Sequence, residues 1–229
     1  MDAGSHSFGA GVPVVLHGRQ NVLTFAPRLW PESTVVCIGC GPSLTQSDVE
    51  LVHNAHAAGC IYVIAINAAI RLAPWADLRY AYHAVDWDRP EDRELLANFK
   101  GLRFGVEGET AKYGVTVMRI ENGGGLQVQR RDTIKHGKNS GYQAINLAVH
   151  LGARRIVLLG YDLKRSLDGR LHFYPCSGKA GKNEFTDWKH YFATLPKALR
   201  AVGVEVVNAT RDTDLTVFPR VSLEEALLC

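Results

Sequence analysis

Long hydrophobic runs are absent from this chain, since no stretch approaches the roughly 18 apolar residues needed to span a membrane. The N-terminus also lacks the basic and then apolar segments of a secretory signal peptide. We therefore expect a cytoplasmic protein without a membrane span. The chain also lacks a large excess of charge of one sign: 26 Lys and Arg oppose 23 Asp and Glu, which leaves a formal charge of +3. Such a small charge argues against nucleic acid as the main partner.

A disulfide scaffold and several catalytic motifs are also missing. The five cysteines are odd in number and irregularly spaced, so we expect no disulfide framework and a reducing compartment. Cys37 and Cys40 fit C-x-x-C, but a zinc site needs a second ligand pair, and none is evident. The sequence has no P-loop, no H-E-x-x-H and no Ser-His-Asp signature, which argues against P-loop NTPases, zinc proteases and serine hydrolases.

Short apolar runs that stop at a small or polar residue are the main positive feature of the sequence. Five runs of this kind are 35–38 before Gly39, 62–66 before Asn67, 79–85 before Asp86, 156–159 before Gly160, and 204–207 before Asn208. In an open parallel sheet, ligands bind outside the carboxyl ends of the strands. If the five runs are parallel strands, their polar endings meet at one crevice, which points to a nucleotide-type ligand.

Helical patterns alternate with these runs. We expect helices over about 45–58, 140–151, 184–202 and 222–228, and a long polar loop over 163–183. Strands that alternate with helices predict an α/β fold, a Rossmann-like three-layer sandwich with a mainly parallel sheet. We expect a single nucleotide-binding domain over 35–229, preceded by an N-terminal arm or edge strand over 1–34.

The turn after the first run is a candidate phosphate site. Gly39, Gly41, Pro42 and Ser43 lie between an expected strand and an expected helix. Glycines let the backbone approach a ligand, and a helix N-terminus presents free N–H groups to an anion. The pattern is not G-x-G-x-x-G, so a plain tight turn with a Ser43 or Thr45 N-cap is the competing interpretation.

The start of the 140–151 helix is a second candidate anion site. Asn139, Ser140 and Gly141 open this helix. Four cations lie just upstream, namely Arg130, Arg131, Lys135 and Lys138. A solvated basic loop with an ordinary helix cap is the alternative.

Polar residues at the strand ends form a third group. Asn67, Asp86, Asp162 and Asn208 would share one edge of the sheet, although each of them also suits an ordinary turn. Asp86 and Asp88 form a D-x-D pair, a weak candidate for Mg²⁺ on a diphosphate. Asp162 is also a candidate catalytic residue.

His172 lies in the long polar loop, near the expected ligand edge. A histidine there suits a general base for an attacking hydroxyl. His172 is therefore the first candidate catalytic residue.

Residues 36–44 resemble the G-x-G-P-S-L nucleotide turn of a Rossmann-like superfamily. That superfamily includes bacterial lipo-oligosaccharide sialyltransferases and archaeal 6-hydroxymethylpterin pyrophosphokinase-like proteins. The segment 139–162 resembles their second block, which runs S-G, helix, L-G, strand and G-x-D. The strongest resemblance is to uncharacterised phage and prophage proteins, which share blocks like 73–77, 139–148 and 207–210. It covers roughly residues 35–227.

The resemblance to the sialyltransferases implies that six residues line a nucleotide-sugar site, namely Gly39, Gly41, Ser43, Asn67, Ser140 and Gly141. The family's catalytic base follows the G-x-D strand, where His172 is the nearest match in a different sequence context. The pyrophosphokinase-like branch implies instead that Asp86, Asp88 and Asp162 act with a divalent cation.

The favoured function is a glycosyltransferase that uses a nucleotide-activated sugar and a glycan or small-molecule acceptor. The nucleotide sugar is then the expected donor, and Mg²⁺ stays open as a cofactor. One alternative is Mg²⁺-dependent diphosphate transfer to a small alcohol such as a pterin. Another is a non-catalytic nucleotide-binding or interaction module. A homo-oligomer is compatible with each of these readings.

Overall fold

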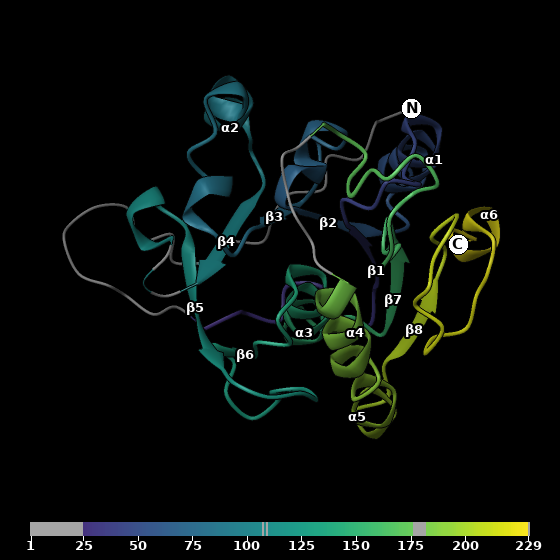
Figure 1. Ribbon diagram of the computed structural model, residues 1–229. Coiled ribbons are helices and arrows are strands. Elements are labelled where there is room, and N and C mark those ends of the chain that lie inside the picture. Colours follow the sequence, from purple (N-terminus) through teal and green to yellow (C-terminus); the bar gives the residue numbers. More distant parts are fainter. Residues whose placement is uncertain (1–24, 107, 109, 176–181, 229) are drawn as a thin grey trace, which may run out of the picture.

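The computed structural model describes residues 25–106, 108, 110–175 and 182–228. Its centre is one sheet of eight strands, all paired in parallel (Figure 1). The strands are β1 Thr34–Ile38, β2 Tyr62–Ile66, β3 Leu78–Tyr80, β4 Leu102–Val106, β5 Thr116–Glu121, β6 Thr133–Lys135, β7 Arg155–Leu159 and β8 Glu205–Asn208. The predicted α/β fold with a mainly parallel sheet is confirmed.

The strand order is β6-β5-β4-β3-β2-β1-β7-β8. The chain therefore runs outward from β1 to β6, and then returns to place β7 on the other side of β1. The order reverses between β1 and β7, where Val36 pairs with Val157 and Ile38 with Leu159. In open α/β sheets such a reversal opens a crevice at the carboxyl ends of the strands.

Helices cover both faces of the sheet (Figure 1). They are α1 Gln46–Ala57, α2 Arg93–Asn98, α3 Ser140–Leu151, α4 Lys182–Phe192, α5 Leu195–Ala201 and α6 Leu223–Ala226. The described residues also form four 3-10 helices, η1 Asn67–Arg71, η2 Ala84–Asp86, η3 Pro90–Asp92 and η4 Ala111–Tyr113.

The alternation of side chains along the strands creates two cores. Val35 and Cys37 belong to the core that includes residues of α3, α4 and α5, whereas Val36 and Ile38 belong to the core that includes residues of α1 and α6. Both groups are fully buried, as expected when successive side chains point to opposite faces of a central strand. The sheet and its two helical layers are the predicted three-layer sandwich.

The third strand is shorter than predicted, because β3 ends at Tyr80 rather than at residue 85. The chain after Tyr80 folds back over the end of the strand. There the buried guanidinium of Arg79 donates to the Asp86 carbonyl and Trp87 Nε1 donates to the Ala81 carbonyl. Asp86 therefore belongs to η2 and does not end a strand.

The predicted helix over 184–202 is two helices. Pro196 stands in the first turn of α5, where its missing N–H costs nothing, and it prevents continuation of α4. The segment 130–138 was expected to be a loop, but it contains β6, three residues paired with β5. No strand occurs within the described residues 25–33, and the rest of the predicted arm over 1–34 lies outside the described residues.

Cys60 is disulfide-bonded, whereas Cys37 and Cys40 are free. This single bond was not predicted from the sequence, which argued only against a disulfide framework. Among the helices that the structure describes, none is long and apolar enough to cross a membrane.

Candidate functional site

A cavity of about 240 Å³ opens at the carboxyl edge of the sheet, where the strand order reverses. Its wall comes from the ends of β1, β2 and β7, the N-terminus of α3, the loop after β7, and α4. Nine of the residues predicted as site residues line it, namely Gly39, Gly41, Pro42, Asn67, Asn139, Ser140, Gly141, Asp162 and His172. The cavity thus lies where the sheet topology places ligands.

The two turns that follow β1 and β7 pack directly on each other. Gly41 donates its N–H to the Gly160 carbonyl at 2.9 Å. A Cβ added to Gly39 would lie 2.6 Å from the Gly160 carbonyl oxygen, and one added to Gly41 would lie 1.8 Å from Asp162 Oδ1. The G-x-G pattern is therefore required by this close approach of two turns, a contact that the sequence alone could not reveal.

Asp162 connects the turn after β7 to the turn after β1. Its Oδ2 accepts a hydrogen bond from the Ser43 N–H at 2.9 Å, while its Oδ1 has no partner among the described residues. The side chain is almost fully buried, and this burial raises the pKa of Asp162 from 3.8 to about 6. A buried carboxyl with a raised pKa that lines a cavity marks a functional candidate.

The N-terminus of α3 forms the facing wall. Asn139 caps the helix, because its Oδ1 accepts the N–H groups of Gly141 and Tyr142 at 2.8 and 3.2 Å. Tyr161, a buried residue after β7, donates its hydroxyl to the Gly141 carbonyl at 3.1 Å. Ser140 lines the cavity, and neither its N–H nor its hydroxyl has a hydrogen-bond partner in the described part of the chain. They remain available to an anionic or hydroxylated ligand.

Left-handed backbone conformations gather around the cavity. The described residues include four non-glycine positions with a positive φ, and three of them line the cavity: Asn67 at 52°, Lys138 at 53° and Leu163 at 50°. Such conformations cost free energy and persist where the surrounding structure enforces them, often at ligand sites. Asn67 Oδ1 is also buried without a hydrogen-bond partner among the described residues, so it lacks a donor that a ligand can supply.

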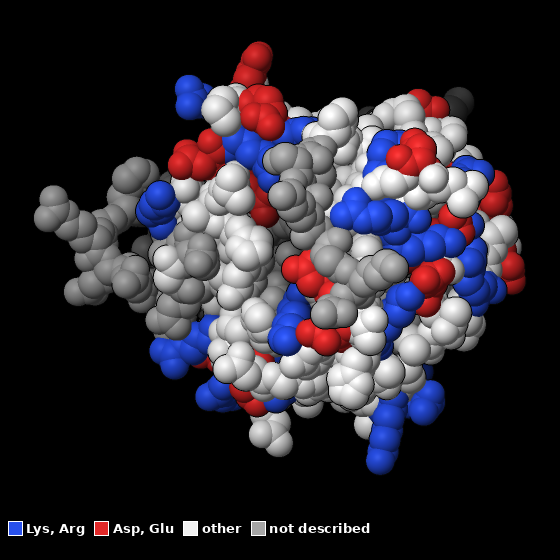
Figure 2. Space-filling model, viewed as in Figure 1, with Lys and Arg blue, Asp and Glu red and all other residues white. Residues whose placement is uncertain are grey.

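Two lysines supply positive charge to the cavity wall. Lys138 pairs with Asp187 at 3.1 Å, and Lys164 pairs with Asp212 and, at 3.7 Å, with Asp214. Figure 2 shows acidic and basic side chains interspersed on this side of the molecule, over β7 and β8. The lysines therefore contribute donors within ion pairs, and there is no large uncompensated basic surface in this view.

The other cations of the predicted basic loop do not reach the cavity. Arg130 and Lys135 pair with Glu121, and Arg131 donates to the His150 carbonyl at 2.7 Å. Only Lys138 of that group lines the cavity. Arg130 and Lys135 therefore contact β5, and Arg131 contacts the end of α3.

His172 enters the cavity from the loop after β7. The next residue, Phe173, donates its N–H to the Cys40 carbonyl at 3.1 Å, and the imidazole stacks on Tyr174 with ring centroids 5.3 Å apart. Burial lowers the pKa of His172 below its usual 6.5, so the ring is mostly neutral at physiological pH. A neutral imidazole can accept a proton, as a general base must.

Other residues of the wall were not predicted as site residues, and four of them bring aromatic or ionisable side chains from distant segments. Phe185 and Trp188 come from α4 and contact each other edge-on at 5.4 Å, and His83 and Lys164 complete the rim. The sequence pattern gave no signal for them, because they reach the cavity through contacts between distant segments.

Four predicted residues lie outside the cavity wall. Asp86 binds Arg89 at 3.0 Å, and Asp88 accepts the Tyr113 hydroxyl at 3.1 Å. Asn208 is fully buried and bonds the Leu215 carbonyl and the Thr210 N–H. Ser43 contributes its backbone N–H to Asp162, and its hydroxyl contacts the Asp212 backbone. No group of three or more metal-ligating side chains occurs among the described residues.

Comparisons with known proteins identify a similar fold. A solved structure of the MAf glycosyltransferase from Magnetospirillum magneticum AMB-1 superimposes with a TM-score of 0.60 at 11% sequence identity. The match covers 87% of this chain but 35% of that one, so the present chain spans about a third of its neighbour's length. No protein-family model and no curated protein sequence matches the chain. The likeness supports the Rossmann-like α/β fold.

Proposed function

We propose that this protein is a glycosyltransferase that uses a nucleotide-activated sugar. The observation that carries the proposal is the cavity at the β1–β7 reversal, around which Asn67, Lys138 and Leu163 hold left-handed backbone conformations. A site of this kind stores strain that a purely structural surface has no need for. The fold likeness to a glycosyltransferase agrees with the proposal.

In this proposal, the donor lies across the ends of β1, β2 and β7. The phosphate contacts the free Ser140 N–H at the N-terminus of α3, where the helix dipole favours negative charge. Lys138 and Lys164 then exchange part of their contact with carboxylates for contact with the phosphate. Asn67 Oδ1 accepts a hydrogen bond from a hydroxyl or amino group of the nucleoside.

The reaction in this proposal is attack by an acceptor hydroxyl on the anomeric carbon of the donor sugar. His172 takes the hydroxyl proton as the new C–O bond forms. The bond from the anomeric carbon to the phosphate oxygen breaks, and the departing phosphate keeps that electron pair. Ser140, Lys138 and Lys164 stabilise its developing charge. Asp162 keeps the Gly41 turn in place and offers Oδ1 to a donor group of the ligand.

Magnesium-dependent diphosphate transfer finds less support in this geometry. Asp86 Oδ1 accepts both Nε and Nη2 of Arg89, at 3.3 and 3.0 Å, so a cation of the protein already occupies its ligand position. Asp88 is engaged by Tyr113, and neither carboxylate lines the cavity. The D-x-D pair therefore does not fit a Mg²⁺ site that serves this cavity.

The acceptor is a hydroxyl-bearing glycan or small molecule. If the gene belongs to a phage or prophage, a cell-surface glycan or a modified DNA base fits this role, and the near-neutral charge favours the glycan.

The experiment that tests the proposal compares wild type with His172→Ala in a transfer assay. Release of the nucleoside phosphate is followed with a panel of nucleotide sugars and hydroxyl acceptors. We expect the variant to lose transfer by a factor of about 100 or more, as is usual when a general base is removed, and to keep its donor affinity. Unchanged turnover in the variant would refute the role of His172.

A further inference from the structure

A continuous series of contacts connects a buried carboxylate near α2 to His172. Arg71, the last residue of η1, donates Nε to Asp92 Oδ1 at 2.6 Å and Nη2 to Asp92 Oδ2 at 3.1 Å. The same guanidinium contacts Glu91 at 2.9 Å, and its Cζ lies 5.1 Å from the centroid of the Tyr174 ring. Tyr174 in turn stacks nearly parallel on His172, with 9° between the ring planes.

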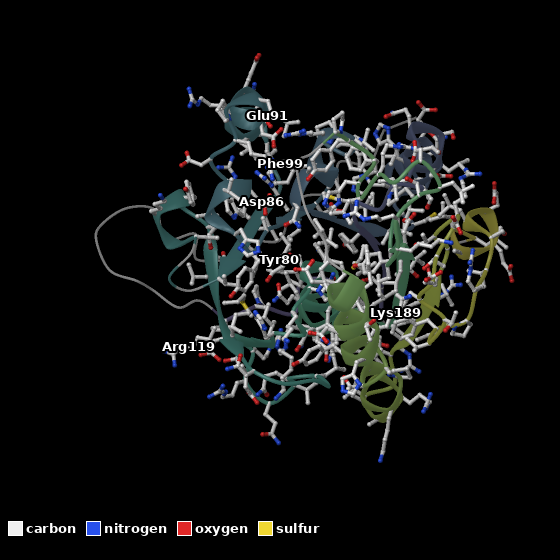
Figure 3. The ribbon with its side chains drawn as sticks, viewed as in Figure 1. Tyr80, Asp86, Glu91, Phe99, Arg119 and Lys189 are labelled. Atoms are coloured by element: carbon white, nitrogen blue, oxygen red, sulfur yellow. The ribbon has the colours of Figure 1, made fainter. Side chains whose placement is uncertain are left out.

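The orientation of Arg71 is fixed by contacts that do not involve the loop. Asp92 is 1% exposed and binds the guanidinium through both oxygens, a geometry that sets the plane of the group. In Figure 3, Glu91 lies beside α2, and Asp86 lies below it toward the sheet. The carboxylates of η3 therefore fix the guanidinium of Arg71, which comes from η1, against the Tyr174 ring.

The loop that carries His172 has a second attachment at the Cys40 carbonyl, which accepts the Phe173 N–H. Tyr174 is the next residue, so the backbone contact and the ring contact hold two consecutive residues directly after His172. Arg71 also ends the same 3-10 helix that begins at the strained residue Asn67. One short helix thus joins a cavity wall residue to the anchor of the loop.

We propose that Arg71 is a positioning residue that holds His172 at the cavity by clamping Tyr174. This inference rests on the proposed function for the role of His172, but the contact itself does not. It also accounts for the acidic segment 86–92, because Asp86 and Asp92 bind arginines at this anchor.

The charged groups around His172 come from three elements. Asp86 lies on η2, Arg89 follows it, and Arg165 belongs to the same loop as His172. Their effects on the imidazole oppose one another, and burial by the packed loop is the dominant cause of its lowered pKa. Release of the loop from Arg71 exposes the ring to water, so it should raise the pKa of His172 toward 6.5.

The test uses the full chain and four variants. Tyr174→Ala removes the clamped ring and leaves the Arg71–Asp92 pair intact, whereas Arg71→Met removes the clamp itself. Tyr174→Phe keeps an aromatic ring for both the stack and the cation contact, so it should behave as wild type. Arg170→Met is the matched control, because Arg170 lies on the same loop in an exposed pair with Asp168 at 2.7 Å.

The first readout is the titration of the His172 imidazole by NMR in the ligand-free protein. We expect a raised His172 pKa in Tyr174→Ala and Arg71→Met, and the wild-type value in Tyr174→Phe and Arg170→Met. An unchanged titration in Tyr174→Ala would overturn the proposal. Loss of one partner of a buried pair can unfold Arg71→Met, so Tyr174→Ala decides the test in that case.

The second readout is turnover, which a merely structural contact would not affect selectively. We expect kcat to fall about tenfold or more in Tyr174→Ala with the donor KM nearly unchanged, because a misplaced base impairs the chemical step. A normal kcat would overturn the positioning role. The titration needs no substrate, so it judges the anchor even if His172→Ala refutes the proposed function.

Discussion

Substitution of Asp162 by asparagine should stabilise the protein at high pH. Burial raises the pKa of this carboxyl from 3.8 to about 6 in the folded protein. Since a tenfold change in an equilibrium is worth about 1.4 kcal/mol, ionisation of Asp162 in the fold costs about 3 kcal/mol at pH 8. Asparagine keeps an oxygen for the Ser43 N–H but carries no charge. The weaker neutral hydrogen bond offsets about 1 kcal/mol of this gain.

The pH dependence of the unfolding free energy is the cleaner prediction, because the difference in hydrogen-bond strength is the same at every pH and cancels. A raised folded pKa means that the folded state binds more protons than the unfolded state between about pH 4 and 6. The stability of the wild type therefore falls as pH rises through this window, whereas Asp162→Asn lacks this contribution. The difference in unfolding free energy should shift in favour of the variant by about 2 kcal/mol between pH 4.5 and 8.

The assay is urea denaturation of both proteins across this pH range. Asp168→Asn is the matched control, because Asp168 is an exposed carboxylate paired with Arg170 and is not among the groups that shift the pKa of Asp162, so its loss should not stabilise the fold at high pH. A difference between wild type and Asp162→Asn that does not change with pH would refute the reasoning. A natural protein that retains such a destabilising carboxylate has a use for it in the cavity.

Three further predictions concern single residues. Asn67→Gly relieves a φ of 52°, so it should leave the unfolding free energy equal or raise it by up to about 1 kcal/mol. Because the variant also lacks Oδ1, nucleotide should no longer raise its Tm, and an equal rise of Tm in variant and wild type would contradict this. Gly41→Ala places a methyl group 1.8 Å from Asp162 Oδ1 and should cost about 1–3 kcal/mol. Gly59→Ala strains a left-handed φ of 76°, but its added Cβ meets no atom within 4 Å, so it should cost less. Equal chemical denaturation midpoints for the two variants would count against the turn contact. The hydrogen bond to Asp77 raises the pKa of His56, so this pair should stabilise the fold by less than about 1 kcal/mol below pH 6.5 and lose that contribution as pH rises through the folded pKa. Denaturation of wild type and His56→Ala from pH 5.5 to 9 measures the contribution, and a stability difference that does not change with pH would exclude it.

Local patterns predicted those elements whose burial is simple. β1, β2 and β7 are apolar runs buried on both faces, and α3 has apolar residues at helical spacing, a capping Asn139 and Gly152 in a left-handed conformation at its end. Their bounds depend on residues next to one another in the sequence, so they could be read directly.

Prediction failed where a distant contact decides the structure. β3 stops early because buried Arg79 binds the backbone of η2, and β6 is a strand only because β5 lies beside it. In the same way, the two glycine-rich turns were found as motifs, but the reason for Gly41 is the carboxyl of Asp162, 121 positions later in the chain. The aromatic wall of α4 depends on tertiary packing for the same reason.

Ligand-induced stabilisation tests the central claim most directly. Purified protein is melted with CMP, UDP, GDP, ADP, ATP, NAD and CMP- and UDP-sugars, each with and without Mg²⁺ or Mn²⁺. A ligand at 100 times its Kd adds about 2.7 kcal/mol to the folded state, a readily measured rise in Tm. The account predicts that one nucleotide and its sugar conjugate raise Tm in wild type without added metal and fail to do so in Asn67→Gly. Absence of any response across the panel, or stabilisation by ATP with Mg²⁺ alone, would contradict it.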